Sequence, residues 1–334
     1  MAQRGVVCGG AGLASYCDEA KGGALRGMVK TRSGLMSRRE HAGFMLRRSF
    51  MFATFLAMAF SMLNVSLSAG DDFVIPTVEG EAVTLPTDVG HVLFLPKTLD
   101  IRCGHVDLLI HFHGDPATVR NNAGYAGVEA AVLTVNYPGL SSAYRKPFEN
   151  AAFFAEVSEA ARAVLRDRYP AAPPIALGRI GVSSFSAGYG AVRELLKRPE
   201  YVHQIDALLL ADSLYASFES EQDSTPRDEH MEGFRAFAQS AAREEKVMIV
   251  THSQVLTHTY ANTAETADDL LRHVGVEVRD VDEKGLGALR FFRRAEVGGF
   301  SVWGAAGDDG DAHMAHLRYI GQWLSDLELG VKVP

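Results

Sequence analysis

Cysteine is scarce in this sequence, with three residues in 334, and their positions exclude a disulfide framework. Cys8 and Cys17 precede an apolar segment near the N-terminus, so Cys103 is the only thiol in the chain that follows it. A single thiol cannot form an intramolecular disulfide. Cys103 lies in the turn-like sequence IRCGH with no obvious base beside it, which favours an inert thiol over a nucleophile.

Basic residues are also in short supply over most of the chain. Residues 1–69 hold nine Lys or Arg and three Asp or Glu, so residues 70–334 hold 24 basic and 38 acidic residues and a net charge of −14. An acidic surface repels nucleic-acid phosphates and anionic lipid headgroups. We therefore expect no nucleic-acid partner, and contact with a membrane only through an uncleaved N-terminal segment.

A hydrophobic run long enough to span a bilayer is lacking as well. The apolar stretch from Phe50 to Leu63 is shorter than the about 20 residues that a membrane-spanning helix needs. It follows Arg47 and Arg48 and precedes small residues through Ala69, a layout typical of a secretory signal peptide. The sequence thus predicts export, to the periplasm or the medium, with an uncleaved membrane anchor as the alternative.

These features divide the chain into three expected parts. Residues 1–44 are rich in Gly, Ala and Arg, have no sustained apolar period, and are predicted to be an unstructured upstream extension. Residues 45–69 form the signal peptide or anchor, and we expect translation to begin at Met45. Residues 70–334 are long enough to form one folded domain with a sizeable core.

Short apolar runs alternate with helical patterns over the folded part, and we find no internal repeat. The predicted strands are residues 73–78, 91–96, 107–112, 130–137, 179–184, 206–212, 246–252 and 300–307. The predicted helices are residues 149–170, 187–199, 232–245, 263–275 and 311–329. This alternation predicts an α/β fold with a mostly parallel central sheet and helices on both faces. Ligands of such sheets bind at the carboxyl ends of the strands.

One strand and helix meet at a turn with a characteristic spacing of small residues. In RIGVSSFSAGYGAVRELL, Ser184 and Gly188 lie two residues before and after Ser186. Small residues are needed there because the flanking backbones approach each other, while the central residue is strained and exposes its side chain. The sequence predicts Ser186 as a nucleophile and the Ala187 N–H, at the positive end of the helix, as an oxyanion donor.

Around this turn the chain resembles the α/β-hydrolase fold family, over nearly the whole stretch from about Val92 to Leu327. Members commonly show G-x-S-x-G at the turn, and this sequence has Ser184 in place of the first glycine. The resemblance implies a serine hydrolase, similar to esterases, with residues 70–334 as its catalytic domain. The connection Ser213–Met231 is too short for a large cap domain and is predicted to be a polar loop near the site.

The hexapeptide HFHGDP allows two interpretations. The resemblance implies that a His-Gly turn after the third strand completes the oxyanion hole, so Gly114 and Asp115 are predicted amide donors and His113 shapes the turn and contacts substrate. Alternatively, His111, His113 and Asp115 resemble the H-x-H-x-D-H run of metallo-β-lactamase-like hydrolases, but Pro116 stands where the last histidine should be. We predict no metal and no cofactor, and a metal-dependent hydrolase remains an alternative.

The resemblance also implies a histidine after the last strand and a carboxylate that fixes its tautomer. His313 lies at the edge of a Gly/Asp-rich turn and is the predicted base, whereas His316, one helical turn further, is predicted to be a surface histidine. Family members commonly place the acid after the seventh strand, but THSQVLTHTYANT has no acid before Glu265. Asp212, after the preceding strand, is therefore the predicted acid, and the chain order Ser186, Asp212, His313 is retained. A capping role is the alternative for Asp212.

Two further side chains follow predicted strands. Tyr137 in VNYPG and His252 in THSQ are expected at the same rim, Tyr137 as a substrate contact, with loop packing as the alternative for both. Taken together, the sequence predicts an exported serine hydrolase that cleaves an ester of a small molecule or polymer, or else an amide, through an acyl-enzyme intermediate. A non-catalytic binding protein on a hydrolase scaffold is the remaining alternative.

Overall fold

A computed structural model describes residues 73–87, 91–102, 104–220 and 222–330. These residues all belong to one compact unit, Asn64–Pro334. The predicted extension 1–44, the predicted signal segment 45–69 and Cys103 lie outside the described residues, so export remains a prediction. Within the described ranges, no helix has the length and apolar character required to cross a bilayer.

A single sheet organises the described chain, with ten strands in the order β1-β2-β4-β3-β5-β6-β7-β10-β9-β8. The strands are β1 (Gly80–Thr84), β2 (Val92–Pro96), β3 (His105–Phe112), β4 (Ala131–Val135), β5 (Ala176–Phe185), β6 (Ile205–Ala211), β7 (Val247–His252), β8 (Arg279–Lys284), β9 (Arg290–Val297) and β10 (Phe300–Ala305). Along this order, the six strands β4, β3, β5, β6, β7 and β10 pair with one another in parallel. The outer strands pair antiparallel: β1 with β2 and β2 with β4 on one side, and β10 with β9 and β9 with β8 on the other.

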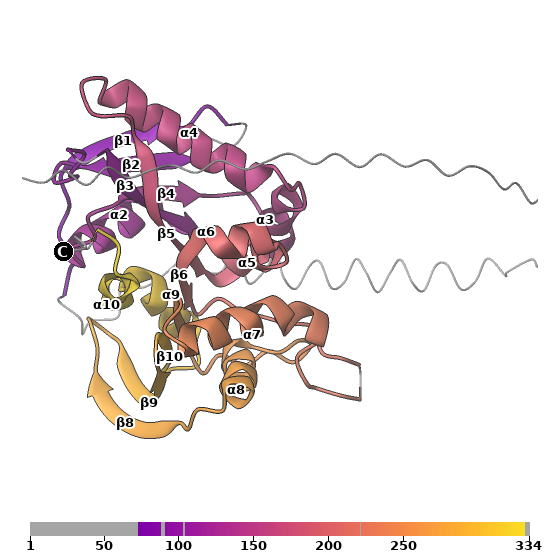
Figure 1. The fold of residues 1–334 in the computed structure, drawn as a ribbon. Helices are drawn as coiled ribbons and strands as arrows, with labels where there is room; N and C mark the ends of the chain where they lie inside the picture. The colour runs from indigo at the N-terminus through magenta and orange to yellow at the C-terminus, as the bar shows by residue number, and fades with distance from the viewer. Residues whose placement is uncertain (1–72, 88–90, 103, 221, 331–334) are drawn as a thin grey trace, which may run out of the picture. The chain divides into compact units, whose positions relative to one another are not determined.

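Helices cover both faces of this sheet, as Figure 1 shows. The helices are α2 (Pro116–Tyr125), α3 (Ser141–Phe148), α4 (Phe153–Arg168), α5 (Tyr189–Leu196), α6 (Pro199–Gln204), α7 (Asp228–Ala242), α8 (Thr263–Val274), α9 (Gly310–Arg318) and α10 (Gly321–Leu324), with 3-10 turns η1 (Ser186–Gly188) and η2 (Ser325–Leu327).

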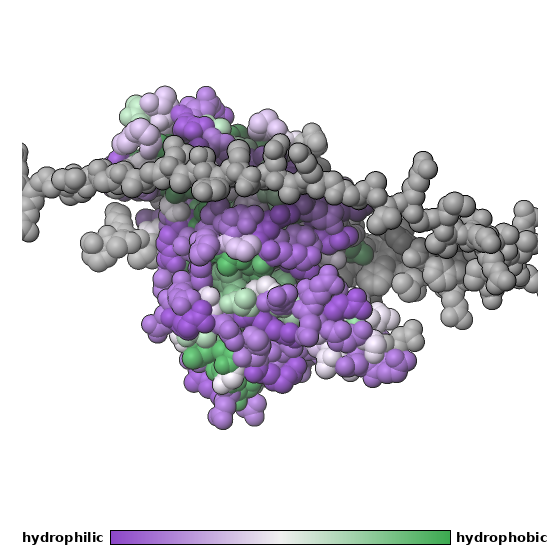
Figure 2. Space-filling model, turned by 45° about the vertical axis from the view of Figure 1, so that its right-hand side comes forward, coloured by the Kyte–Doolittle hydropathy of each residue, from purple (hydrophilic) through white to green (hydrophobic). Residues whose placement is uncertain are grey.

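The two faces form two separate hydrophobic clusters. Successive strand residues point to opposite faces, so Ile110 packs with residues of α3 to α8, whereas Leu109 packs with residues of α2, α9 and α10. Strands buried on both faces explain the continuous apolar runs of the sequence. The outer surface visible in Figure 2 is mainly hydrophilic, with smaller hydrophobic areas. The predicted fold class, an α/β-hydrolase fold without a large cap, is confirmed for the described residues.

The predicted strand at residues 73–78 is wrong. This segment, FVIPTV, forms no strand; instead the ring of Phe73 packs edge-on against Tyr125 with centroids 5.7 Å apart. Three strands were not predicted, namely β1, β8 and β9. β1 and β8 lie at the two edges of the sheet and are mostly exposed, so they lack the apolar pattern that marks a buried strand. The short helices α2, α3 and α6 were also missed.

Candidate active site

Backbone strain gathers at the carboxyl ends of three neighbouring strands. Five non-glycine residues in the described ranges have a positive φ, and three of them directly follow β3, β5 and β6. These are His113 at 70°, Ser186 at 47° and Asp212 at 43°. A left-handed conformation is costly for residues with a side chain and tends to occur where function requires it. All three were predicted as site residues.

The turn at Ser186 has the tight geometry that its sequence predicts. β5 ends at Phe185, η1 begins at Ser186, and α5 follows without a break. At Gly188 a Cβ atom would lie 2.2 Å from the carbonyl oxygen of Phe112, so only glycine allows α5 to approach β3 this closely. Ser186 is partly exposed, whereas Ala187 and Gly188 are buried.

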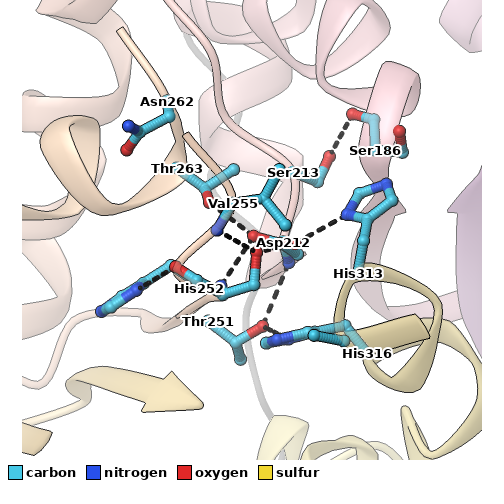
Figure 3. A network of polar contacts seen from close by, with 12 residues as sticks. Ser186, Asp212, Ser213, Thr251, His252, Val255, Asn262, Thr263, His313 and His316 are labelled. Atoms are coloured by element: carbon cyan, nitrogen blue, oxygen red, sulfur yellow. Dashed lines mark hydrogen bonds and ion pairs between the residues drawn. The ribbon is translucent and has the colours of Figure 1, made fainter. Parts of the chain in front are cut away.

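Ser184, which replaces the first glycine of the family pattern, has a role in this turn. Its Oγ lies 2.8 Å from Ser213 Oγ, and Ser213 Oγ donates to the carbonyl oxygen of Ser186 at 2.9 Å. Because the Ser213 proton is used in the second bond, Ser184 donates in the first. The Ser213 hydroxyl thus ties the segment after β6 to the backbone of the strained serine (Figure 3).

A buried carboxylate and a histidine lie beneath this turn. His313 Nδ1 is 2.6 Å from Asp212 Oδ2, and the two residues are 8% and 0% exposed. The ring of Phe185, the residue before Ser186, stacks on the His313 ring with centroids 4.6 Å apart. Figure 3 shows the other ring nitrogen of His313 pointing toward Ser186. The structure therefore brings together Ser186, Asp212 and His313.

The Asp212 carboxylate accepts three more hydrogen bonds. Ser253 donates its backbone N–H to Oδ1 at 2.9 Å and its hydroxyl to Oδ2 at 2.7 Å, and Thr263 Oγ1 donates to Oδ1 at 2.5 Å. Burial alone would raise the pKa of Asp212, but His316, His313 and the Thr263 hydroxyl hold it well below its usual value. Asp212 is thus a fixed, ionised partner of His313 rather than a helix cap.

Two histidines differ from their predicted environments. His316, predicted at the surface, is fully buried, with Nδ1 2.6 Å from Thr251 Oγ1 and its ring stacked on Trp323. His252, predicted at the rim, is also fully buried. Burial lowers the pKa of His316 to about 4 and that of His252 to about 3, so both are neutral near pH 7. The pattern of α9 alone could not show the burial of His316, because the groups that contact its ring, Thr251 on β7 and Trp323 on α10, belong to other elements.

The His-Gly turn after β3 is fixed by side chains around it. Asn136, which follows β4, accepts from the Gly114 N–H at 3.1 Å and donates to the Gly114 carbonyl at 2.8 Å. The Gly114 amide is therefore occupied, and the prediction that it faces an oxyanion is wrong. The amide of Asp115 follows directly, and its carboxylate caps α2 by accepting from the Thr118 N–H at 2.8 Å.

The two histidines of HFHG contact protein groups on different elements. His111, fully buried, donates from Nε2 to the His113 carbonyl at 3.1 Å and accepts at Nδ1 from Ser183 Oγ at 2.8 Å. His113 Nδ1 lies 2.7 Å from Tyr144 Oη. Burial lowers the pKa of His111 to about 3 and of His113 to about 4.

These contacts leave the HFHGD side chains poorly placed as metal ligands. Both ring nitrogens of His111 and the carboxylate of Asp115 are engaged within the protein. Across the ranges that the structure describes, no three His, Cys, Asp or Glu side chains converge as a metal-binding group.

Tyr137 and the loop after β6 flank the same end of the sheet. Tyr137 is partly exposed, and its Oη lies 3.2 Å from His91 Nε2. The segment that begins at Ser213 is tied to the segment after β7 by a bridge between Ala216 and Ala261. Tyr137 remains a predicted substrate contact, and the loop Ser213–Met231 remains a predicted polar loop near the site.

Several supporting residues were not predicted from the sequence. They are Asn136, Tyr144, Ser213, Ser253 and Thr263. Asn136, Ser213 and Ser253 come within two residues of the end of a parallel strand, so the same reasoning that selected Asp212 could have found them. Thr263 and Tyr144 could not be found this way, because they reach the site from helices α8 and α3.

Comparisons with known proteins find a likeness only among solved structures, since no protein-family model and no curated protein matches the chain. A cold-adapted esterase from an Arctic intertidal metagenomic library is 12% identical, with 79% of this chain and 100% of that chain covered and a TM-score of 0.41. An S-formylglutathione hydrolase from Staphylococcus aureus is 14% identical, with 76% and 99% covered and a TM-score of 0.38.

A third similar structure is the feruloyl esterase module from Clostridium thermocellum, at 10% identity, with 80% and 100% covered and a TM-score of 0.38. The class defined by the strand order and the strained serine turn of this chain is the α/β-hydrolase fold.

Proposed function

We propose that this protein is a serine hydrolase that cleaves carboxylic esters through an acyl-enzyme intermediate. The observation that supports this most is the buried hydrogen bond of 2.6 Å between Asp212 and His313, next to a serine held at a φ of 47°. A nucleophile, a base and a group that orients the base are the three parts that acyl transfer by serine requires.

In this proposal Ser186 Oγ attacks the ester carbonyl and His313 Nε2 accepts its proton. Asp212 accepts the Nδ1–H of His313, which fixes the tautomer with a free Nε2 and stabilises the imidazolium as it forms. The protonated His313 then gives its proton to the departing alcohol. Water repeats the sequence on the acyl-enzyme, with His313 again as base, and releases the acid.

The negative oxygen of the tetrahedral intermediate needs donors that are already in place. We assign the backbone N–H groups of Ala187 and Asp115 to this role. Ala187 lies at the start of the η1–α5 segment. The two hydrogen bonds between the Asn136 side chain and the Gly114 backbone hold the peptide that leads to Asp115. His113 and Tyr137 form part of the wall beside it. No cofactor enters this mechanism.

The proposal is tested by labelling the purified protein with a fluorophosphonate probe and mapping the modified peptide. We expect label on Ser186, and loss of both label and ester hydrolysis in Ser186→Ala. Ser240→Ala, on α7, is the control and should label normally. Hydrolysis that survives Ser186→Ala but disappears with a chelator would instead support the metal-dependent alternative, and a folded protein that takes no label would support a binding role.

A further inference from the structure

Three strands bring His252, Gly304 and Arg293 into one row of the sheet. Gly304 on β10 pairs with His252 on β7 on one side and with Arg293 on β9 on the other. The histidine directly precedes Ser253, the residue that donates twice to Asp212. The row therefore connects the outer antiparallel strands to the acid of the proposed triad.

Gly304, at the centre of this row, has no side chain, and the side chains of His252 and Arg293 fill the space that this leaves. A Cβ atom on residue 304 would lie 2.6 Å from Arg293 Cγ and 2.7 Å from His252 Cε1. Both distances are far below van der Waals contact. The backbone of Gly304 does not have a positive φ, so space rather than conformation requires the glycine.

Across this gap, Arg293 fixes the tautomer of His252. Arg293 Nε lies 2.7 Å from His252 Nε2, and His252 Nδ1 lies 3.0 Å from the carbonyl oxygen of Ser253. A guanidinium can only donate and a carbonyl can only accept. His252 must therefore carry its proton on Nδ1, accept from Arg293, and donate to Ser253.

Burial strengthens this arrangement. His252 is fully buried, and burial followed by the charge of Arg293 lowers its pKa to about 3. The Arg293 side chain is 17% exposed and pairs through its other end with Asp268 on α8, at 2.7 Å. Asp268 is 43% exposed, so the chain of contacts runs from the surface through Arg293 and His252 to the peptide of Ser253.

We propose that Arg293 and His252 are positioning residues for Asp212, and that Gly304 is the opening that lets them meet. Arg293 orients His252, His252 donates to the carbonyl oxygen of Ser253, and the backbone N–H and the hydroxyl of Ser253 both donate to Asp212. The inference rests on the proposed function, in which Asp212 orients His313. It gives the β8–β9 hairpin, absent from the predicted strands, a role in the site.

The first test compares two arginines of similar burial. Arg293→Met removes the contact with His252. Arg235→Met is the control: the Arg235 side chain is 18% exposed, close to the 17% of Arg293, and it pairs with Asp269, the neighbour of Asp268 on α8. We expect Arg293→Met to lower kcat about tenfold with KM changed less than about twofold, because misorientation of a catalytic group slows the chemical step more than binding. Arg235→Met should retain the wild-type kcat.

The second test uses the position of the donor on residue 252. His252→Asn places an amide N–H near the position of Nδ1 and should retain kcat within about threefold, whereas His252→Leu has no donor and should lose about tenfold or more. Gly304→Ala separates Arg293 from His252 without removing either, and should resemble Arg293→Met. If His252→Leu fails to fold, Arg293→Met, Gly304→Ala and His252→Asn still decide the proposal.

A readout independent of turnover is the proton NMR signal of the His313 Nδ1–H that is bonded to Asp212. We expect it to shift or broaden in Arg293→Met and Gly304→Ala but not in Arg235→Met. Equal kcat in Arg293→Met and wild type, or equal losses in Arg293→Met and Arg235→Met, would overturn the positioning role. Failure of the proposed function would appear separately, as absence of fluorophosphonate label on the wild-type Ser186.

Discussion

At the scale of single residues, the site depends on side chains that each have one feasible hydrogen-bonding pattern. Asp212 is the clearest case, since its two oxygens accept from Ser253 N–H and Oγ, Thr263 Oγ1 and His313 Nδ1. All four partners donate, so a charged carboxylate satisfies every one of them. An uncharged amide cannot, because its NH2 group would face a donor.

We therefore expect Asp212→Asn to lower kcat by about 10³- to 10⁴-fold, because the amide favours the wrong His313 tautomer. Steady-state kinetics on a soluble ester would measure this. Asp206→Asn is the matched control: Asp206 lies near the other end of β6, where its carboxylate accepts from the Ile180 N–H, and the variant should stay within about twofold of wild type. Near-normal turnover of Asp212→Asn would remove Asp212 from the mechanism.

At the scale of elements, close approaches between backbones decide where the site residues lie. The start of α5 touches the end of β3 because Gly188 has no side chain. This contact brings the Ser186 turn next to the His-Gly turn, so the two proposed oxyanion donors come from adjacent segments. The edge strands of the sheet do not shape these turns; they end the sheet.

The edge strand β8, RDVDEK, is protected against pairing with another copy. An antiparallel pair of two β8 strands centred on Val281 and Asp282 would place Arg279 opposite Lys284 and Asp280 opposite Glu283. Like charges directly opposite each other are destabilising, and charged edges prevent edge-to-edge association. The strand can therefore end the sheet while carrying β9, and with it Arg293, into place.

A substitution at the α5–β3 contact should cost stability. Gly188→Ala puts a Cβ 2.2 Å from the Phe112 carbonyl oxygen, and we expect the free energy of unfolding to fall by about 1–3 kcal/mol, together with a loss of activity. Urea denaturation would measure the change. Gly310→Ala, at the start of α9, is the control, since a Cβ there meets nothing within 4 Å. Equal stability of the two variants would contradict the proposed close contact.

At the scale of the whole molecule, sensitivity to acid follows from histidines that are buried in the neutral state. His111, His252 and His316 are fully buried, with pKa values lowered to about 3, about 3 and about 4, mainly by burial. In the unfolded chain each has a pKa near 6.5. Below that pH the unfolded state binds protons that the folded state does not, so acidification favours unfolding.

We expect stability to be constant above about pH 7 and to fall between pH 6.5 and 4 by roughly 1 kcal/mol per pH unit for each of these three histidines. Asp212, whose pKa is depressed, adds a further loss at still lower pH, as the pH falls below its unfolded value. Thermal denaturation at a series of pH values would show this. A melting temperature independent of pH over this range would contradict the expectation.

The sequence by itself determined the parts of the protein that local pattern controls. Continuous apolar runs marked the buried parallel strands, and the spacing of small residues around Ser186 marked the strained turn. Polar residues directly after strands pointed to Asp212 and, through the family resemblance, to His313. These signals are readable because burial on two faces and a tight turn each restrict residue type at neighbouring positions.

Only the tertiary structure decided which groups surround that pattern. The strands β1 and β8 are mostly exposed and have no apolar signature, and β9 mixes the buried Phe291 and Ala295 with charged residues, so nothing local indicates that β9 brings Arg293 to His252 across Gly304. Nor does local pattern show that His316 is buried, or that Asn136 occupies the Gly114 amide. Such contacts join residues far apart in the chain, and they depend on sheet order and register, which are set only when the whole core packs.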